Sequence, residues 1–302
     1  MTATGSQPTV IELDSPPDLT PLLGKVALRA LPVPGLSPRA GAHLPNTVAV
    51  LRETTVDLEH VTAYADVCGF RLADTLPLTY LHLLGFPLSV MLMTRPDFPF
   101  GLMGMVHIRN TILSHRPVGI GETVQVTAGI RNLRPHPKGQ QLDNVVTVTS
   151  GGLPVWESTS TYLKRGTPDE DAGMPARDGV GGADDVDVSA LPLTAKWRVP
   201  DDIGRRYGGV SGDRNPIHLT ALSAKPFGFP RAIAHGMWTK ARCLAALEGR
   251  LPDACTVDVA FKLPLLLPGS VSYVSAQRDG DWVFGVRGRD GKPHLAGIVT
   301  PA

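Results

Sequence analysis

The sequence carries almost no excess of charge. Among its 302 residues, 29 are Lys or Arg and 28 are Asp or Glu, which leaves a net charge of +1. A chain so close to neutral has no broad attraction for a polyanion or an anionic membrane surface. We therefore expect no nucleic-acid partner, and any anionic ligand must be bound by basic residues that gather locally.

Cysteine is scarce as well. The three cysteines are Cys68, Cys243 and Cys255, and they form neither a CxxC pair nor part of a His-rich cluster. This spacing gives no zinc-ligand pattern, and an odd, sparse set is typical of a reducing compartment rather than of a disulfide framework. The sequence thus predicts a cytoplasmic protein without a metal site.

Long apolar runs are also missing. The longest, Leu81–Met93, is interrupted by Gly85 and Pro87, and it is shorter than the ~20 residues that span a bilayer. The first residues, MTATGSQPTVIELDSPPD, are polar and acidic, unlike a signal peptide. We expect no insertion into a membrane.

Three short motifs are absent: GxGxxG, GxxxxGK and GxSxG. The first two would predict a phosphate-binding loop for a nucleotide, and the third would predict the nucleophile of a serine hydrolase. We expect a function that needs no nucleotide and no other cofactor.

A change in composition divides the chain. Residues 166–190 are rich in Gly, Asp, Pro and Ala and contain no aromatic residue. Such a composition is typical of a flexible linker. We predict an N-terminal domain of residues 1–165, a flexible linker of residues 166–190 and a C-terminal domain of residues 191–302.

The two halves resemble each other. Tyr64–Arg71 reads YADVCGFR and Tyr207–Arg214 reads YGGVSGDR, with Tyr, Val, Gly and Arg in the same register. An apolar helix candidate follows each segment, Leu78–Thr94 in the first half and His235–Arg250 in the second. This shared order indicates an internal duplication.

Strand-like segments follow each helix candidate. Turn dipeptides such as Asp279–Gly280 separate them. The segments are Gly104–Leu113, Glu122–Leu133, Leu142–Ser150 and Val155–Leu163, then Cys255–Leu263, Ser270–Arg278, Trp282–Arg289 and His294–Val299. We predict an α+β fold in which each half is a helix followed by an antiparallel meander that wraps around it.

The densest group of polar residues is Ser211–His218, SGDRNPIH. Its Gly, Asn and Pro residues indicate a loop. On a folded loop, Asp213 and His218 can point at one spot, and a carboxylate beside an imidazole suits general acid–base chemistry. The pair could hold one water molecule between its two side chains.

A second candidate site begins at His235 and Gly236, where the second apolar helix starts. A glycine allows a ligand to approach the backbone, and the free N–H groups of a first helical turn stabilise developing negative charge. An acid–base pair combined with such an oxyanion hole indicates chemistry next to an enolate, on a thioester or a similar carbonyl compound.

These residues belong to a longer resemblance. The segment YGGVSGDRNPIHLTALSAKPFGFPRAIAHGM, followed by VAFKLPLLLPG, resembles the hydratase motif of the MaoC-like dehydratases and (R)-specific enoyl-CoA hydratases. Those proteins have the hotdog fold, a long helix wrapped by an antiparallel sheet. LPLTYLHLLGFPLSVMLM in the first half resembles the N-terminal half of fused, actinobacterial-type MaoC proteins, which implies a double hotdog.

The resemblance implies roles for individual residues. In the family, the aspartate and histidine of the motif bind and activate the catalytic water, which gives these roles to Asp213 and His218. Asn215 would arrange the loop, and Gly236 would donate its N–H to the thioester carbonyl. Ser211 and His235 would organise the loop or the substrate, and two further residues enter from the first half.

Those two residues are Phe70, which aligns with Asp213, and Thr75, which aligns with His218. The first half thus has neither the acid nor the base and should be catalytically silent. We expect Phe70 and Leu81–Met93 to line the space for an acyl chain.

The expected substrate is an acyl thioester of coenzyme A or of acyl carrier protein, in fatty-acid metabolism. Two alternatives stay open: a hotdog thioesterase, and a non-catalytic protein that binds acyl thioesters. Fusion of two hotdog units would make a pseudo-dimer within one chain, and a homodimer of such chains is a further possibility.

Overall fold

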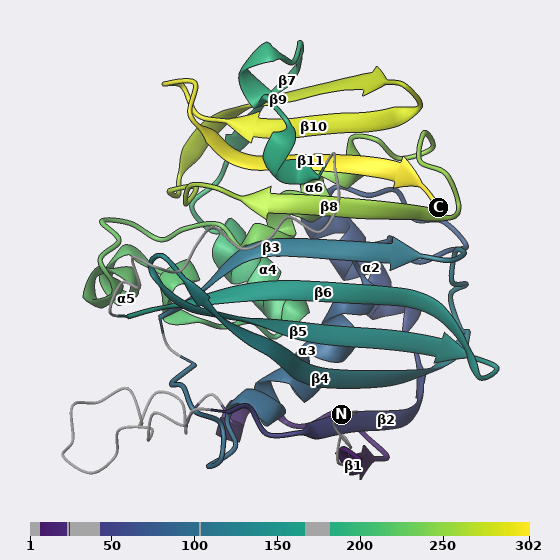
Figure 1. Ribbon diagram of the computed structural model, residues 1–302. Helices are drawn as coiled ribbons and strands as arrows, with labels where there is room; N and C mark the ends of the chain where they lie inside the picture. Colours follow the sequence, from purple (N-terminus) through teal and green to yellow (C-terminus); the bar gives the residue numbers. More distant parts are fainter. Residues whose placement is uncertain (1–6, 23, 25–42, 103, 167–181) are drawn as a thin grey trace, which may run out of the picture.

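The structure is a computed structural model that describes residues 7–22, 24, 43–102, 104–166 and 182–302. Within these residues the chain forms a single sheet of eleven strands, in the order β1-β2-β4-β5-β6-β3-β8-β11-β10-β9-β7. The longer helices cover one face of this sheet (Figure 1).

The strands are β1 (Thr9–Leu13), β2 (Thr47–Thr55), β3 (Met105–Ser114), β4 (Thr123–His136), β5 (Gly139–Ser150), β6 (Leu153–Arg165), β7 (Leu193–Val199), β8 (Cys255–Phe261), β9 (Gly269–Arg278), β10 (Asp281–Arg287) and β11 (Pro293–Pro301). The α-helices are α2 (Leu58–Cys68), α3 (Leu81–Met93), α4 (Ile203–Ser211), α5 (Ala221–Ala224) and α6 (Gly236–Ala245). The 3-10 turns are η1 (Ala183–Asp185), η2 (Val188–Ala190), η3 (Pro216–His218) and η4 (Lys225–Phe227).

The predicted duplication is confirmed by the strand order. From the centre outwards, the first half runs β3-β6-β5-β4-β2 and the second runs β8-β11-β10-β9-β7. The eight predicted strands lie at the expected places, and β1, β2 and β7 are additional. The two halves meet where β3 pairs antiparallel with β8. The result is the expected double hotdog.

One part of the predicted topology is wrong. The meander holds for β4-β5-β6 and β9-β10-β11, but β3 and β8 pair with β6 and β11, the last strands of their halves. This arrangement puts the first strand of each meander at the centre of the sheet. The alternation of side chains along a strand does not specify its partner, so the sequence pattern could not reveal this pairing.

The aligned segments of the two halves are equivalent in three dimensions. Helices α2 and α4 end in the same way, at Gly69 with φ 80° and at Gly212 with φ 75°. Both angles lie in the left-handed region, where glycine carries no Cβ penalty. The rings of Tyr64 and Tyr207 lie 6.2 Å apart, so these two helices meet at the boundary between the halves.

Helices α3 and α6 are the central helices of the two units. α3 begins at Leu81 and is apolar on all sides, as expected of a buried helix. α6 begins directly after His235, but it ends at Ala245 and continues as turns rather than reaching Arg250. No helix in the described ranges is long and apolar enough to cross a membrane.

The predicted flexible linker is wrong for residues 182–190. These residues fold into η1 and η2, in which Ala183 and Val188 are buried. Val188 packs with Val274 and Val283 in a small apolar cluster that is separate from the main core. Asp and Gly residues dominate this segment, so its composition does not predict that Val188 is buried. Residues 167–181 lie outside the described residues, and the division into domains stays a prediction.

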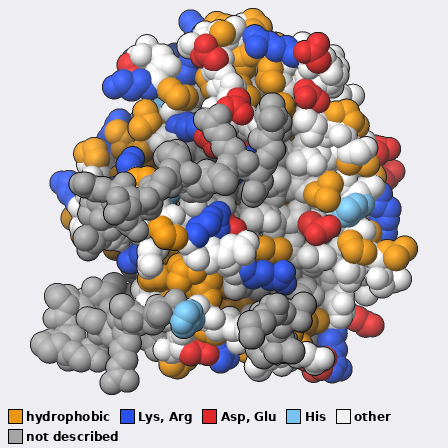
Figure 2. Space-filling view, in the orientation of Figure 1, with side chains coloured by type: hydrophobic (Ala, Val, Ile, Leu, Met, Phe, Trp, Pro, Cys, Tyr) orange, Lys and Arg blue, Asp and Glu red, His pale blue; other side chains and the backbone are white. Residues whose placement is uncertain are grey.

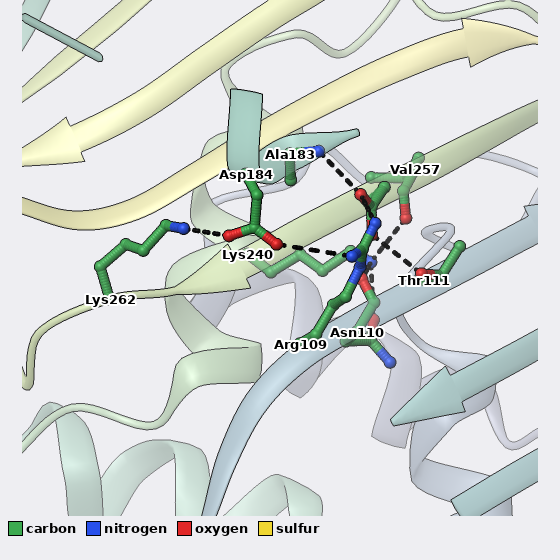
Figure 3. Close-up of polar contacts among 9 residues, drawn as sticks. Arg109, Asn110, Thr111, Ala183, Asp184, Lys240, Val257 and Lys262 are labelled. Atoms are coloured by element: carbon green, nitrogen blue, oxygen red, sulfur yellow. Dashed lines mark hydrogen bonds and ion pairs between the residues drawn. The ribbon is translucent and has the colours of Figure 1, made fainter. Parts of the chain in front are cut away.

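Polar side chains reinforce the junction between the halves (Figure 3). Arg109 on β3 donates two hydrogen bonds to the carboxylate of Asp258 on β8, at 2.8 and 2.6 Å. The same carboxylate accepts from the backbone N–H of Ala183 at 2.8 Å. Asp184 contacts both Arg109 and Lys262. These bonds tie both central strands to η1.

Lys240 also joins the central strands, from the opposite face. Its side chain extends from α6 and is fully buried. The ammonium group donates to the backbone and side-chain oxygens of Asn110 on β3, at 3.0 and 2.6 Å, and to the carbonyl of Val257 on β8, at 3.1 Å (Figure 3). Burial lowers the pKa of Lys240 from 10.5 to about 7, although Asp258 opposes that shift.

The pKa of Lys240 predicts a dependence of stability on pH. Between about pH 7 and pH 10.5 the unfolded chain binds the Lys240 proton more tightly than the folded chain does. The free energy of unfolding should therefore rise with pH in this window, relative to Lys240→Met, by at most ~1.4 kcal/mol per pH unit. Urea denaturation at several pH values measures the difference, in which the contributions of Cys68 and Cys243 cancel because Lys240 does not influence their pKa values. Lys292→Met, at an exposed position, serves as the control, and parallel wild-type and Lys240→Met curves would contradict the prediction.

Candidate active site

A cavity of about 500 Å³ opens between the two halves. The first half contributes side chains from α3, β3 and β6. The second half contributes the loop after α4, the start of α6 and the end of β8. Predicted site residues that line the cavity are Ser211, Asp213, Asn215, His218, His235 and Gly236. The structure thus brings the predicted site residues of the second half together in one place.

Local hydrogen bonds shape the loop that carries Asp213 and His218. The Ser211 hydroxyl accepts from the N–H of Asp213 at 3.2 Å, and the Asp213 carboxylate accepts from the N–H of Asn215 at 3.2 Å. The Asn215 side chain then caps η3 by accepting from the N–H of Ile217 at 3.4 Å. Each polar side chain fixes the backbone two residues further on, which is the behaviour expected of Ser, Asp and Asn in turns.

Two glycines on one face of α4 allow this loop to lie against the helix. A Cβ on Gly204 would be 1.9 Å from the carbonyl oxygen of His218, and one on Gly208 would be 2.9 Å from that of Asp213. Both distances are shorter than a carbon–oxygen contact. The spacing of four residues in GRRYG places both glycines under the loop, so α4 supports the two predicted catalytic residues directly.

Asp213, His218 and His235 form a compact cluster. The rings of His218 and His235 stack with centroids 3.6 Å apart. His235 Nε2 donates to the backbone oxygen of Asp213 at 2.9 Å and lies 3.7 Å from its carboxylate. His235 therefore fixes the backbone of Asp213 through this hydrogen bond. The Nδ1 of His235 is buried and has no partner among the described residues.

The tautomer of His218 follows from its surroundings. Its Nδ1 lies 2.7 Å from the carbonyl oxygen of Ile233. A carbonyl can only accept a hydrogen bond, so Nδ1 carries the proton and Nε2 keeps a free lone pair. His218 can thus accept a proton at Nε2 while its ring stays fixed through Nδ1.

Burial keeps both imidazoles neutral. It lowers the pKa of His218 from 6.5 to about 3, with His235 adding to the shift and Asp213 opposing it. Burial also lowers the pKa of His235 to about 4. At neutral pH the two rings beside Asp213 are therefore neutral. One ligand atom from each of the three residues lies within 4.8 Å of the others, and His235 Nε2 already donates to the backbone oxygen of Asp213.

Gly236 is the first residue of α6 and lies beside the cluster. In the described structure its backbone N–H has no protein acceptor, as expected for the first turn of a helix. A Cβ at this position would approach the ring of Phe261 to 3.0 Å. Glycine thus keeps the start of α6 close to Phe261 and leaves one N–H available to a ligand in the cavity.

Phe70, the predicted acyl-pocket residue, does not line this cavity. It stacks on Tyr64 with ring centroids 6.3 Å apart. The reason lies at the end of α2, where the N–H groups of Gly69 and Phe70 both donate hydrogen bonds to the carbonyl oxygen of Ala65. The chain folds back there onto α2. Thr75 is exposed and pairs with Gly119, away from the cavity.

Three polar cavity residues of the first half had no individual role predicted from the sequence: His82, His107 and Tyr162. His82 lies in the run Leu81–Met93 that was expected to line the acyl space, and it and Ser89 are the two polar residues of that helix. A shift of strand register separates His107 from Arg109: His107 pairs with Tyr162, and Arg109 pairs with the adjacent Thr161. The local sequence gives no sign of this bulge. Within the run Leu81–Met93, Leu83 and Phe86 do line the cavity, as expected.

The fold and this cluster together define a double hotdog protein with an aspartate and two histidines beside the start of its second central helix. Residues 184–286 match the MaoC like domain. The chain is 37% identical over 279 residues to 3-hydroxyacyl-thioester dehydratase X of Mycobacterium tuberculosis, covering 91% of this chain and 95% of that protein. The chain therefore belongs to the MaoC-like dehydratase family.

Solved structures agree with this assignment. The crystal structure of HtdX from Mycobacterium tuberculosis superposes with a TM-score of 0.74 at 36% identity, covering 84% of this chain and 100% of that one. A MaoC-like dehydratase from Phytophthora capsici superposes with a TM-score of 0.67 at 16% identity, covering 84% of this chain and 95% of that one. The second likeness concerns the fold alone.

The environment of His218 can be tested by nuclear magnetic resonance. In protein labelled with ¹⁵N-histidine, we expect a protonated Nδ1 and an unprotonated Nε2 that do not change between about pH 8 and about pH 5, because the pKa lies at about 3. His218→Gln identifies the signals. Titration of the folded-state signals near neutral pH would contradict the assignment.

The same lowered pKa predicts a dependence of stability on pH. Since the unfolded chain binds this proton near pH 6.5, the His218 contribution to the free energy of unfolding should fall as the pH decreases from 6.5 towards 3.

Proposed function

We propose that the protein catalyses the reversible hydration of trans-2-enoyl thioesters to (R)-3-hydroxyacyl thioesters. The observation that carries this proposal is the convergence of three groups on one cavity: the Asp213 carboxylate, the free Nε2 of His218 and the N–H of Gly236. The family relationship to 3-hydroxyacyl-thioester dehydratase X supports the same reaction class.

In this proposal, Asp213 and His218 together hold the attacking water. The carboxylate and His218 Nε2 are both acceptors, so each can take one hydrogen of the same water molecule. The hydroxide part forms a bond to C3 of the enoyl group, and the pair receives the remaining proton. That proton then passes to C2 on the same face. Dehydration follows the same steps in reverse.

Gly236 stabilises the enolate that forms between these steps. As the C–O bond forms at C3, electron density moves to the thioester oxygen. The free N–H at the start of α6 can donate to that oxygen, and the helix dipole favours the negative charge there. No residue of the first half takes part in proton transfer. That half instead lines the cavity with apolar side chains such as Leu83, Phe86 and Met105, which suit an acyl chain.

The substrate is an acyl thioester of coenzyme A or of acyl carrier protein. Arg165 also lines the cavity and offers positive charge to a phosphate of the carrier. On the face shown in Figure 2, basic and acidic side chains of the described residues are interspersed, which does not favour an extended polyanion as a partner. Since β3 and β8 already pair within one chain, catalysis needs no second copy.

Removal of the acid–base pair is the direct test. We expect Asp213→Asn and His218→Ala each to reduce kcat/KM for hydration of crotonyl-CoA, or of a longer enoyl-CoA, by ~10²–10⁴. Loss of enoyl absorbance measures the rate, and a chiral assay of the product measures its configuration. Asp201→Asn and His115→Ala change the same residue types at exposed positions and should retain wild-type rates.

The same assay separates the alternatives. Near-wild-type turnover by a folded Asp213→Asn or His218→Ala protein would refute the proposed roles. Release of free thiol without loss of the double bond would identify a thioesterase. Tight binding of enoyl-CoA by the wild-type protein, with no turnover under any condition, would identify a binding protein.

A proline at position 236 tests the oxyanion hole. Gly236→Pro removes the N–H, while proline is tolerated at the first residue of a helix and the extended His235, with ψ 138°, is compatible with a following proline. We expect kcat to fall by ~10²–10³. Gly236→Ala keeps the N–H and adds a methyl group against Phe261, so it reports the steric part alone. Equal losses in the two variants would argue against a role for the N–H.

A further inference from the structure

A group of basic side chains lies in the cavity wall that the first half forms. His82 comes from α3 and His107 from β3, and both line the cavity. Lys240 lies behind them on α6 and influences the protonation of both rings. The reaction proposed above uses none of these three residues.

Each imidazole has a ring nitrogen that no protein group uses. His82 is 7% exposed and lines the cavity, and its ring makes no hydrogen bond to another described residue. His107 Nε2 is buried and has no partner in the described part of the chain. Buried polar groups in proteins are normally hydrogen-bonded, so an unpartnered His107 Nε2 beside the His82 ring in one wall of a binding cavity points to a polar ligand group.

The local electrostatics indicate the kind of group. Burial, followed by the charge of Lys240, lowers the pKa of His82 to about 4. Burial, followed by His82 and Lys240, lowers the pKa of His107 well below 6.5. Neutral rings beside a buried ammonium favour an electron-rich atom such as an oxygen. The Lys240 ammonium already donates to three protein oxygens, so a buried carboxylate would lack a free counter-ion.

The position of the His82 and His107 rings indicates that the oxygen group of the ligand belongs to its acyl chain. The His107 ring stacks on Tyr162, with centroids 4.6 Å apart, and contacts the tilted ring of Phe261, with centroids 4.9 Å apart. Phe261 is the ring that packs against Gly236, so the wall is continuous with the proposed thioester site. The next cavity residues along α3 are Leu83 and Phe86, so the polar group is set in an otherwise apolar wall.

We propose that His82 and His107 recognise an oxygen substituent, a hydroxyl or keto group, on the acyl chain of the thioester substrate. This inference rests on the proposed function in taking a thioester as the ligand, and it adds a preference among acyl chains. His82 makes the direct contact, and His107 supports it from the neighbouring strand. Plain hydrocarbon chains still bind, but they leave the imidazoles unsatisfied.

Binding of saturated acyl-CoAs tests the proposal without any turnover. Isothermal titration calorimetry compares a plain chain with chains of equal length that carry one hydroxyl or keto group at successive positions beyond C4. For the wild-type protein we expect at least one position to bind about 10-fold more tightly than the plain chain, which is the effect of one net hydrogen bond. His82→Leu should abolish that preference and leave the affinity for the plain chain equal or higher.

Further variants keep the result interpretable. His82→Gln retains a donor and an acceptor and should keep part of the preference, while His107→Phe retains the stacked ring and should weaken it. Thermal unfolding confirms that each variant is folded, and if His82→Leu does not fold, the other two decide the outcome. Equal affinity for plain and oxygenated chains at every position would overturn the proposal, as would an equal loss of affinity for both chains in His82→Leu.

The two proposals fail in distinguishable ways. If the wild-type protein does not hydrate enoyl-CoAs, the proposed function fails, but the binding preference of saturated chains can still be measured. If the wild-type protein hydrates plain and oxygenated enoyl-CoAs with the same kcat/KM and binds their saturated forms equally, only the preference fails. Asp213→Asn should lose hydration and keep the binding preference, because it leaves His82 and His107 unchanged.

Discussion

The pairing of β3 with β8 is the contact on which the rest of the structure depends. It joins two similar units into one sheet, and it places the first half directly beside the loop that carries Asp213 and His218. The cavity exists only because side chains from both units meet there. Polar side chains from both faces of the sheet hold this junction, with Arg109 and Asp258 on one side and Lys240 on the other. The geometry of the cavity therefore depends on the contacts that stabilise the junction between the two halves.

Much of this arrangement could be predicted from local sequence. Eight strands were expected at the places where they lie, because alternating side chains and turn residues act over short distances. The loop Ser211–His218 was expected as a unit, since its Ser, Asp and Asn residues fix the backbone two positions ahead. The start of the second central helix at Gly236 was also expected. Each of these features is determined by neighbours in the chain.

The remaining features depend on distant contacts. The pairing of β3 with β6 and β8 involves residues far apart in the sequence, and nothing in Met105–Ser114 specifies those partners. Phe70 was misplaced because the backbone after α2 folds back onto Ala65. His82 and His107 became visible as site residues only when the two halves were placed together. Whether a polar residue in an apolar segment lines a cavity depends on packing between units.

The glycines of α4 have a consequence for the evolution of the two halves. The alignment that pairs Tyr64 with Tyr207 pairs Gly204 with Val61 and Gly208 with Ala65. Val61 and Ala65 are buried, so α2 presents methyl groups where α4 presents bare backbone. A loop could not lie on α2 as closely as it lies on α4. An Asp and a His introduced at positions 70 and 75 would therefore not lie against α2 as Asp213 and His218 lie against α4, because the difference between the halves extends into the helix under the loop.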